Sequence, residues 1–392
     1  MKWLPGENDL VPEQNAVKSR IQSESGNHYV SGFPGSGKSV CLLYSAHAIK
    51  AVNPNASILF VEFTHSLIKM IEAALNELHQ KYKDLNLNTI KVVTFDDFRW
   101  KHRGHYDFII CDEVQDTSAT YLNLMKQRAD RIIVGGDPNQ SIHNQLPNGD
   151  IPIDVEGMKS ILSPSTSELT IIHRLNKYVI NAIRAFMPEM RILAEKSSML
   201  KKHKPVYVWK CKDDTDEVVK IMEDANSSLN MGESVAVLFS NKNNIEKFVN
   251  TYLISIGKNP FDFKANKHPR FDRPDYDKLN RYLSSLGIKM QCMTNGYGSL
   301  VTDTDKIILC TYHSAKGLDF DKVFLPFCNP GYGNGDDARL FMVAMSRSRK
   351  DLILSFTWKP NRFIESFIGN RQACQLIDLT VENSNDSDED DW

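Results

Sequence analysis

Short apolar runs alternate with segments of helical pattern along the first 150 residues of the chain. The runs are rich in Val, Ile and Phe, which predicts β-strands. Alternation of strands and helices is typical of a parallel sheet with helices on both faces. We expect strands at His28–Ser31, Ile58–Phe63, Lys91–Phe95, Phe108–Cys111 and Ile132–Gly135, and helices that include Ser39–Val52 and Ser66–Lys83.

A bridging segment follows, with a turn-rich stretch at Pro147–Pro152 and a helix near Lys177–Phe186. The alternation then resumes, so the sequence predicts a second α/β domain. We place the first domain at residues 1–150 and the second at residues 151–378, followed by a tail at residues 379–392. Strands of the second domain are expected at Val206–Lys210, Val235–Phe239, Ile288–Met293, Ile307–Thr311, Val323–Phe327 and Leu352–Phe356, and helices at Glu217–Ala225, Asn244–Ile256, Asp277–Leu286 and Arg339–Arg347.

Composition changes this picture little. Hydrophobic residues make up 41% of the 392 residues, which is enough for two cores. The net charge is −2, and the last twelve residues hold six acids and no base, so the rest of the chain carries +4. No run approaches the roughly 20 apolar residues of a membrane span, and the N-terminus lacks an apolar signal core. The seven scattered cysteines predict buried reduced thiols. We expect an intracellular protein, cytoplasmic in a bacterial or phage-infected cell, with no membrane partner.

A glycine-rich loop carries the strongest chemical signal. It follows an apolar strand and opens a helix, which is the context of a P-loop. Glycines allow backbone N–H groups to surround phosphates, and the helix N-terminus adds partial positive charge. Lys38 is expected to reach the β- and γ-phosphates of ATP, and Ser39 to bind Mg²⁺. The nucleotide-binding residues of this loop are Gly32, Pro34, Gly35, Ser36, Gly37, Lys38 and Ser39.

An acidic pair, Asp112-Glu113, comes directly after the apolar run Phe108–Cys111. An acid at the end of a buried strand beside a P-loop can hold Mg²⁺, which is the role expected for Asp112. The next acid, Glu113, can orient and deprotonate the attacking water. Without the P-loop, the same residues would predict an acidic helix N-terminus.

The sequence Asp112-Glu113-Val114-Gln115-Asp116 resembles the form that this motif takes in superfamily 1A DNA helicases of the UvrD, Rep and PcrA type. Further motifs of that family follow in order over nearly the whole chain. The resemblance implies two tandem RecA-like domains with parallel sheets, and ATP and Mg²⁺ as cofactors. The matching segments are Pro12-Glu13-Gln14, Phe63-Thr64, Thr94-Phe95, Gly136–Ile142, His173-Arg174, Thr311–Phe320 and Arg339–Arg347.

The resemblance also implies a role for individual residues. Gln14 would read the adenine, Gln140 would sense the γ-phosphate, and Gly317 and Asp319 would contact the nucleotide. Two arginines, Arg174 and Arg347, would come from the second domain and stabilise charge on the γ-phosphate in the transition state. If they reach across to the ATP, hydrolysis senses domain closure. Nucleic acid would contact Phe63, Thr64, Thr94, His143, Thr311 and His313.

The chain also departs from this family. Only thirteen residues separate Phe98 from Asp112, so the helical subdomain that the relatives insert here is missing. The relatives place an aromatic residue near position 143 to stack on a base, whereas this chain has His143. Two carboxylates, Asp96 and Asp97, stand where the relatives have His-Ser, and we expect them to repel a phosphate backbone.

These features favour an ATP-driven motor that is stimulated by single-stranded DNA and moves from 3′ to 5′ as its relatives do. RNA is an alternative ligand, and we expect weak unwinding by the protein on its own. A second hypothesis is an ATP-hydrolysing regulatory subunit that controls a partner nuclease in a phage-defence or DNA-repair complex. A third is a silent scaffold, although every catalytic position is intact. The acidic tail is expected to be a disordered, solvated segment. Two alternatives are docking on a basic protein partner and competition with nucleic acid for the groove of the motor itself.

Overall fold

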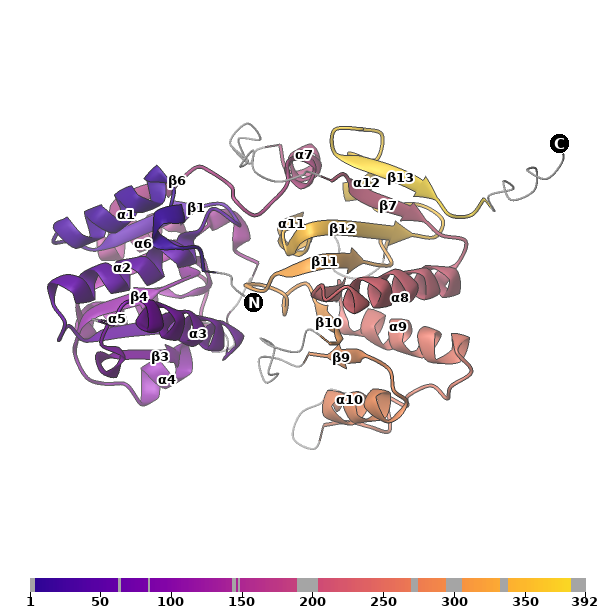
Figure 1. Ribbon diagram of the computed structural model, residues 1–392, viewed down its shortest axis with the longest axis horizontal. Helices are drawn as coiled ribbons and strands as arrows, with labels where there is room; N and C mark the ends of the chain where they lie inside the picture. The colour runs from indigo at the N-terminus through magenta and orange to yellow at the C-terminus, as the bar shows by residue number, and fades with distance from the viewer. Residues whose placement is uncertain are drawn as a thin grey trace. The chain divides into compact units, whose positions relative to one another are not determined.

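The computed structural model describes residues 4–62, 65–83, 85–142, 146, 149–188, 204–268, 274–293, 305–331 and 338–381. The described residues form two compact units, which divide between Leu175 and Asn176. Each unit is an α/β domain around a parallel sheet of its own (Figure 1). The two parallel-sheet domains predicted from the sequence are therefore confirmed.

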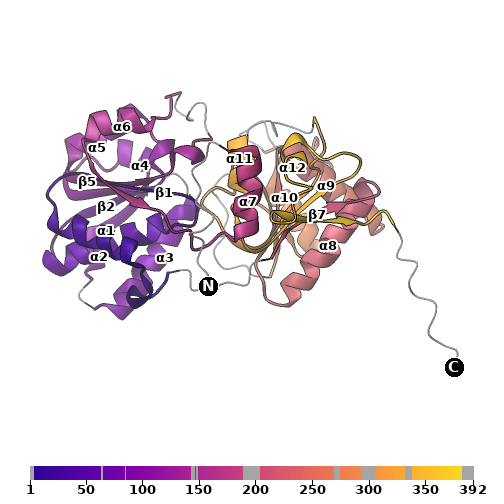
Figure 2. The ribbon, with the colours of Figure 1, turned by 90° about the horizontal axis from the view of Figure 1, so that it is seen from above.

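The described part of unit 1 contains a six-stranded parallel sheet in the order β3-β2-β4-β5-β1-β6. Helices α1–α3 lie on one side of this sheet and helices α4–α6 on the other (Figure 2). The elements are α1 (Pro12–Ser23), β1 (His28–Gly32), α2 (Lys38–Val52), β2 (Ile58–Glu62), α3 (His65–Lys81), β3 (Ile90–Thr94), α4 (Phe95–Trp100), β4 (Tyr106–Cys111), α5 (Ala119–Arg128), β5 (Ala129–Gly136), α6 (Val155–Leu162) and β6 (Ser165–Leu169).

Side chains of β2 alternate between two hydrophobic cores, as the period of a strand requires. Ile58 and Phe60 pack in the core that contains α1, α2 and α3. Leu59 and Val61 pack in the core that contains α4, α5 and α6. All four are fully buried. Burial of each such side chain contributes roughly 1.5–3 kcal/mol, so β2 is held in register from both faces.

The division between the units lies later than the expected boundary at residue 150. Strand β6 pairs in parallel with β1, with His28 opposite Ser165 and Gly32 opposite Leu169. This pairing satisfies the backbone groups along the free side of β1. Residues 151–175 therefore belong to unit 1, and β6 and α6 are elements that the sequence patterns did not indicate.

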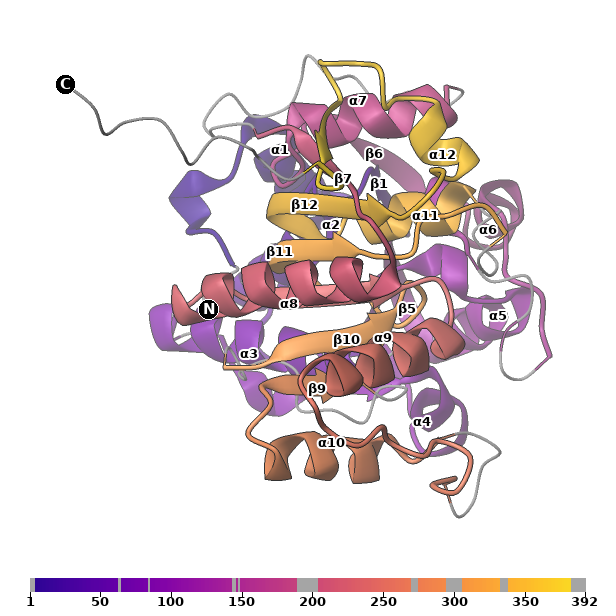
Figure 3. The same cartoon turned by 90° about the vertical axis from the view of Figure 1, so that its right-hand side faces the viewer.

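The described part of unit 2 contains a seven-stranded sheet in the order β13-β7-β12-β11-β8-β10-β9. Strands β7, β12, β11, β10 and β9 are labelled in Figure 3. Helices α8, α9 and α10 share one hydrophobic core with these strands. The elements are α7 (Lys177–Phe186), β7 (Val206–Lys210), α8 (Asp214–Asn230), β8 (Val235–Phe239), α9 (Lys242–Ser255), α10 (Tyr276–Ser285), β9 (Met290–Cys292), β10 (Ile307–Thr311), β11 (Phe320–Leu325), α11 (Ala338–Met345), β12 (Ser348–Phe356), α12 (Arg362–Glu365) and β13 (Cys374–Asp378).

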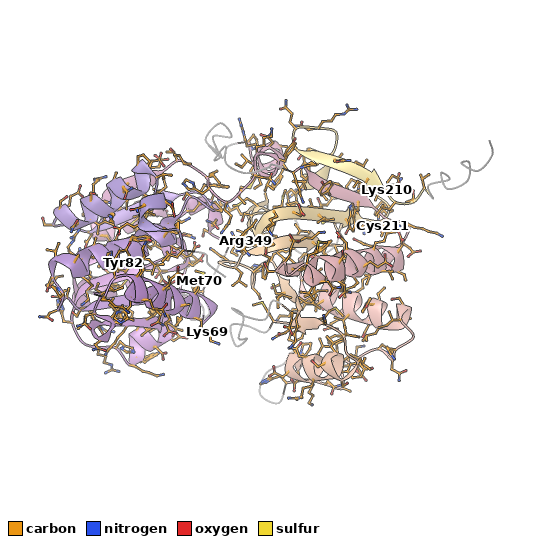
Figure 4. All side chains as sticks on the ribbon, in the orientation of Figure 1. Lys69, Met70, Tyr82, Lys210, Cys211 and Arg349 are labelled. Atoms are coloured by element: carbon orange, nitrogen blue, oxygen red, sulfur yellow. The ribbon has the colours of Figure 1, made fainter. Side chains whose placement is uncertain are left out.

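The edge strand β13 was not predicted from the sequence. It pairs in parallel with β7, and Lys210 at the end of β7 forms an ion pair with Asp378 at 2.9 Å (Lys210 is labelled in Figure 4). A hydrogen bond from Thr380 and, to a smaller extent, this contact with Lys210 lower the pKa of Asp378 to about 2. Residues 382–392 of the acidic tail lie outside the described residues.

All seven cysteines are buried and free, as expected. None of the described helices combines the length and the apolar character that a membrane crossing needs.

Strand β11 ends before the predicted limit, Phe327, because the backbone turns there. Phe327 has a left-handed φ of 58°, and its N–H donates to Glu217 Oε1 at 2.8 Å. Ser355 Oγ donates to the same oxygen at 2.5 Å, while Oε2 has no hydrogen-bond partner among the described residues. Burial raises the pKa of Glu217 to about 7, against the effect of these two hydrogen bonds.

This buried carboxyl predicts that stability depends on pH. Between the ordinary pKa of a glutamate and about pH 7, the folded state holds a proton that the unfolded state has lost. The free energy of unfolding should therefore fall by about 3 kcal/mol as pH rises through this window, and then level off. Glu217→Gln should remove this fall and be more stable than wild type at pH 8. Urea unfolding followed by circular dichroism at pH 5 to 8 measures both effects. Glu223→Gln, on an exposed position of α8, is the control and should keep the wild-type slope. An unchanged slope in Glu217→Gln would contradict the prediction.

Candidate nucleotide-binding site

The P-loop connects the end of β1 to the start of α2. Gly35 and Gly37 have φ values of +81° and +93°, which other residues rarely adopt. Lys38, the first residue of α2, is buried and its Nζ donates to the carbonyl of Gly32 at 2.9 Å. The ammonium is thus held inside the loop, at the N-terminus of a helix, where anions bind.

The acidic pair follows β4, beside the P-loop. Ser39 Oγ donates to Asp112 Oδ2, and the N–H of Glu113 donates to Asp112 Oδ1 at 2.9 Å. Burial raises the pKa of Asp112, the nearby Glu113 raises it further, and Lys38 acts against both. A hydroxyl and a carboxylate are the hard oxygen ligands that Mg²⁺ accepts, with phosphate and water completing the shell. Ser39 and Asp112 therefore fit the ion that the sequence implies.

Glu113 has a left-handed backbone, with φ 52° and ψ 45°. Strain of this kind in a residue other than glycine costs of order 1–3 kcal/mol and is concentrated at functional sites. Gln115 Nε2 donates to Glu113 Oε2, and Gln115 Oε1 accepts from the N–H of Asp137 at 3.0 Å. One buried amide thus joins the acidic pair to the segment after β5.

Asp137 organises that segment. Its Oδ1 accepts from the N–H of Asn139 at 2.9 Å, and its Oδ2 accepts from Gln140 Nε2 at 3.2 Å. Burial raises the pKa of Asp137, while Lys38 lowers it. Gln140 is itself buried, and its amide is held by Asp137, the carboxyl on which the P-loop lysine acts. Gln115 and Asp137 were not predicted as site residues, although both lie within the matching segments.

The first helix, α1, is fastened to the P-loop and to β6. Gln14 Nε2 donates to the carbonyl of Ser36 at 3.2 Å, and Gln14 Oε1 accepts from the N–H of Val11 at the same distance. Glu13 accepts from the N–H and hydroxyl of Thr170 just after β6. Gln14 therefore contacts the loop directly, and adenine reading stays a prediction.

Arg174 lies in unit 1, so its expected origin in the second domain is wrong. The N–H of His173 donates to the carbonyl of Gly35 at 2.9 Å. A Cβ added to Gly35 would lie 2.7 Å from the Cβ of Arg174. The reason is the β1–β6 pairing, which carries the chain from Leu169 directly back over the P-loop.

Unit 2 brings together a second group of predicted residues. The N–H of Phe320 donates to the carbonyl of Arg347 at 3.0 Å, and Arg347 NH1 donates to the carbonyl of Leu318 at 3.3 Å. Arg347 is buried, and its guanidinium also donates to the carbonyl of Val343 and to Ser346 Oγ. Gly317, with φ +81°, and Asp319 flank Leu318 and so lie beside this arginine.

The predicted nucleic-acid contacts are described only in part. Thr94 caps α4, its Oγ1 accepting from the N–H of Asp97 at 3.1 Å. Thr311 ends β10, and its hydroxyl is 3.0 Å from that of Ser314; His313 is exposed. Phe63, Thr64 and His143 lie outside the described residues.

Two family models match the chain. The AAA domain model matches residues 13–145, and the model of the UvrD-like helicase C-terminal domain matches residues 271–359. No curated protein matches the chain.

Among solved structures, a complex of arterivirus nonstructural protein 10 (helicase) with DNA is 16% identical, with a TM-score of 0.45 over 90% of this chain and 65% of that one. The structure of PRRSV helicase is 14% identical, with a TM-score of 0.43 over 88% and 54% of the two chains. This chain therefore spans less than two thirds of the length of these helicases. The assignment to a family rests on the two family models.

Gly35→Ala should disrupt the P-loop. The added methyl would meet Arg174, and the φ of +81° is strained for alanine. We expect a loss of roughly 1–3 kcal/mol in stability and weaker ATP binding. Gly26→Ala is the matched control, because nothing lies within 4 Å of its added Cβ. Titration with a fluorescent ATP analogue and thermal unfolding measure the two effects. Equal affinities for the two variants would show that the close approach at Gly35 is unimportant.

Proposed function

Because the chain belongs to the UvrD-like helicases of superfamily 1 and is therefore an ATP hydrolase, we propose that single-stranded DNA stimulates its turnover and that it moves along that strand from 3′ to 5′. The observation that supports this most is the hydrogen-bonded path from Glu113 through Gln115 to Asp137 and Gln140. It joins the expected general base to the segment that precedes His143, the expected DNA contact. Binding of a DNA strand at His143 can therefore change the geometry in which Glu113 acts on the attacking water.

In the proposed reaction, Lys38 binds the β- and γ-phosphates and is released from the carbonyl of Gly32 to do so. Ser39 and Asp112 hold Mg²⁺, which neutralises charge on the phosphates when bound. Glu113 accepts a proton from the attacking water, and its strained backbone fixes the direction of its carboxylate. Gln140 contacts the γ-phosphate from the neighbouring segment. We further propose that Gly317 and Asp319 contribute to nucleotide binding.

Arg174 is the arginine that the geometry favours for the transition state. It adjoins Gly35 of the P-loop, so it is near the phosphates without help from unit 2. Arg347 differs, because its guanidinium donates three hydrogen bonds within unit 2. We propose that Arg174 stabilises charge on the γ-phosphate, and that Arg347 also positions the segment around Leu318.

The second candidate is an ATP-hydrolysing subunit that regulates a partner nuclease. The short connection between Phe98 and Asp112 favours it, because the subdomain that engages duplex DNA in the relatives is missing. A nuclease-regulating subunit would hydrolyse ATP without stimulation by single-stranded DNA and would co-purify with its nuclease.

The proposal predicts the outcome of one comparison of ATPase rates. Rates are measured without nucleic acid and with single-stranded DNA, duplex DNA or RNA, and single-stranded DNA should give the largest increase. Glu113→Gln should lower turnover roughly 10²- to 10⁴-fold while ATP stays bound, because only proton transfer is lost. Lys38→Ala should weaken ATP binding itself. Glu72→Gln, an exposed carboxylate of α3, serves as the control. No stimulation by any nucleic acid would sink the motor proposal and leave the regulatory one.

Arg174→Ala should lower turnover by about 10³-fold or more with little change in ATP affinity, because the contact strengthens in the transition state. Arg347→Ala should lower turnover and, unlike Arg174→Ala, also the stability of unit 2, because three internal hydrogen bonds are lost. Single-turnover hydrolysis, ATP titration and thermal unfolding separate these effects. Turnover of Arg174→Ala within a few-fold of wild type would remove it from the transition-state role.

A further inference from the structure

A groove lies between α4 and α5 of unit 1, on the face that carries the second hydrophobic core. Its volume is about 530 Å³, which is in the range of small-ligand sites. Six of its eight lining side chains are polar or charged. They are Arg99, Trp100, Arg103, Thr120, Asn123, Leu124, Gln127 and Arg128.

The groove carries positive charge that this unit does not neutralise. None of Arg99, Arg103 and Arg128 forms an ion pair with a described carboxylate. Arg128 is fixed across the groove, since its NH1 donates to the carbonyl of Phe98 at 2.7 Å and to that of His102 at 3.1 Å. Arg103 directly follows His102, whose carbonyl accepts from Arg128, and both arginines line the groove, so the two cations lie close together. Burial and the proximity of Arg103 lower the pKa of Arg128. Two neighbouring like charges attract an anion.

Three carboxylates of α4 and of the start of β5 are already engaged. Asp97 pairs with Lys101 at 2.6 Å, and Asp130 pairs with His105 at 2.7 Å. Asp96 accepts a long hydrogen bond of 3.5 Å from Tyr121. An anion that enters the groove therefore does not have to displace an internal ion pair.

The groove also presents an exposed aromatic ring. Trp100 is 59% exposed, although indole side chains are normally covered. The guanidinium carbon of Arg99 lies 4.9 Å from the ring centroid. Exposed amides at Asn123 and Gln127 add hydrogen-bond donors and acceptors along the same wall.

We propose that this groove binds one nucleotide of single-stranded nucleic acid, with its base stacked on Trp100 and its phosphate at Arg103 and Arg128. An aromatic platform beside a basic wall is what single-strand binding uses. A protein helix would need several apolar anchors, whereas Leu124 is the only aliphatic side chain that lines the groove. This inference rests on the proposed function, because it assigns a second contact to the same strand.

The test uses the full chain and two fluorescent oligonucleotides of equal length, oligo(dT) and an abasic oligonucleotide, in anisotropy titrations. Trp100→Ala should weaken oligo(dT) binding about tenfold, because a stacked base is lost, and should leave abasic binding unchanged. Arg103→Ala should weaken both and reduce the slope of log affinity against log salt by about 0.7, the value for one phosphate on a single strand. Iododeoxyuridine in oligo(dT) should photo-crosslink to Trp100.

Trp358→Ala is the matched control, because Trp358 is 66% exposed and lies in unit 2. It should bind both oligonucleotides as wild type does, and basal ATPase activity should be unchanged in every variant. The groove proposal is overturned if Trp100→Ala binds oligo(dT) normally, or if Trp358→Ala loses as much.

Two outcomes separate this inference from its premise. If DNA stimulates the ATPase but Trp100→Ala behaves as wild type, the groove assignment alone fails. If no oligonucleotide binds or stimulates, the proposed motor fails as well. If oligo-glutamate binds as tightly as oligo(dT) and depends equally on Trp100, the groove is a site for an acidic protein segment, and the nucleotide assignment is wrong.

Discussion

Strand β5 ends in two glycines, Gly135 and Gly136, and the arrangement of the nucleotide site depends on the space left by their missing side chains. A Cβ on Gly135 would lie 2.8 Å from Asp112 Oδ1, and one on Gly136 would lie 2.8 Å from Gln115 Oε1. The register explains why: β5 lies between β4 and β1, and all three strands run parallel and end at one edge. Two missing methyl groups therefore allow the acidic pair to approach both the P-loop and Asp137. Any larger residue would separate the groups that must act on one phosphate.

Two arginines with the same expected role have different surroundings. The chain leaves β6 next to β1, so Arg174 is delivered to Gly35 by a strand pairing. Arg347 instead follows α11 and is enclosed by the carbonyls of Val343 and Leu318. Because the guanidinium of Arg347 donates to these carbonyls, its position depends on the fold of unit 2. A substitution of Arg347 is thus expected to change both turnover and the stability of unit 2, whereas a substitution of Arg174 is expected to change mainly turnover.

Strongly patterned elements could be predicted from the sequence. The predicted strands Val206–Lys210, Val235–Phe239 and Ile307–Thr311 have the observed bounds, because each is a short run of mostly apolar residues between polar segments. Ser165–Leu169 could not be recognised, since its sequence STSEL is polar and only its pairing with β1 makes it a strand. The residues of the candidate site also fall into those that the sequence could predict and those that it could not. The motif residues around the P-loop could be located, whereas the bridging role of Gln115 depends on a contact with Asp137, 22 residues away.

The charge around α4 cannot be judged from the sequence alone, because it depends on which charged side chains pair in the folded structure. Asp96 and Asp97 suggest that α4 repels a phosphate backbone, and this expectation neglects their neighbours. Asp97 is compensated by Lys101 one helical turn later, and Asp96 faces the hydroxyl of Tyr121. Arg99, Arg103 and Arg128 form no ion pair with a described carboxylate, although Arg99 and Asp96 both act on the hydroxyl of Tyr121. An opposite charge at i+4 is worth only a few tenths of a kcal/mol to the helix. Its larger consequence here is to weaken the repulsion expected from Asp97, while repulsion of a phosphate backbone by Asp96 stays a prediction.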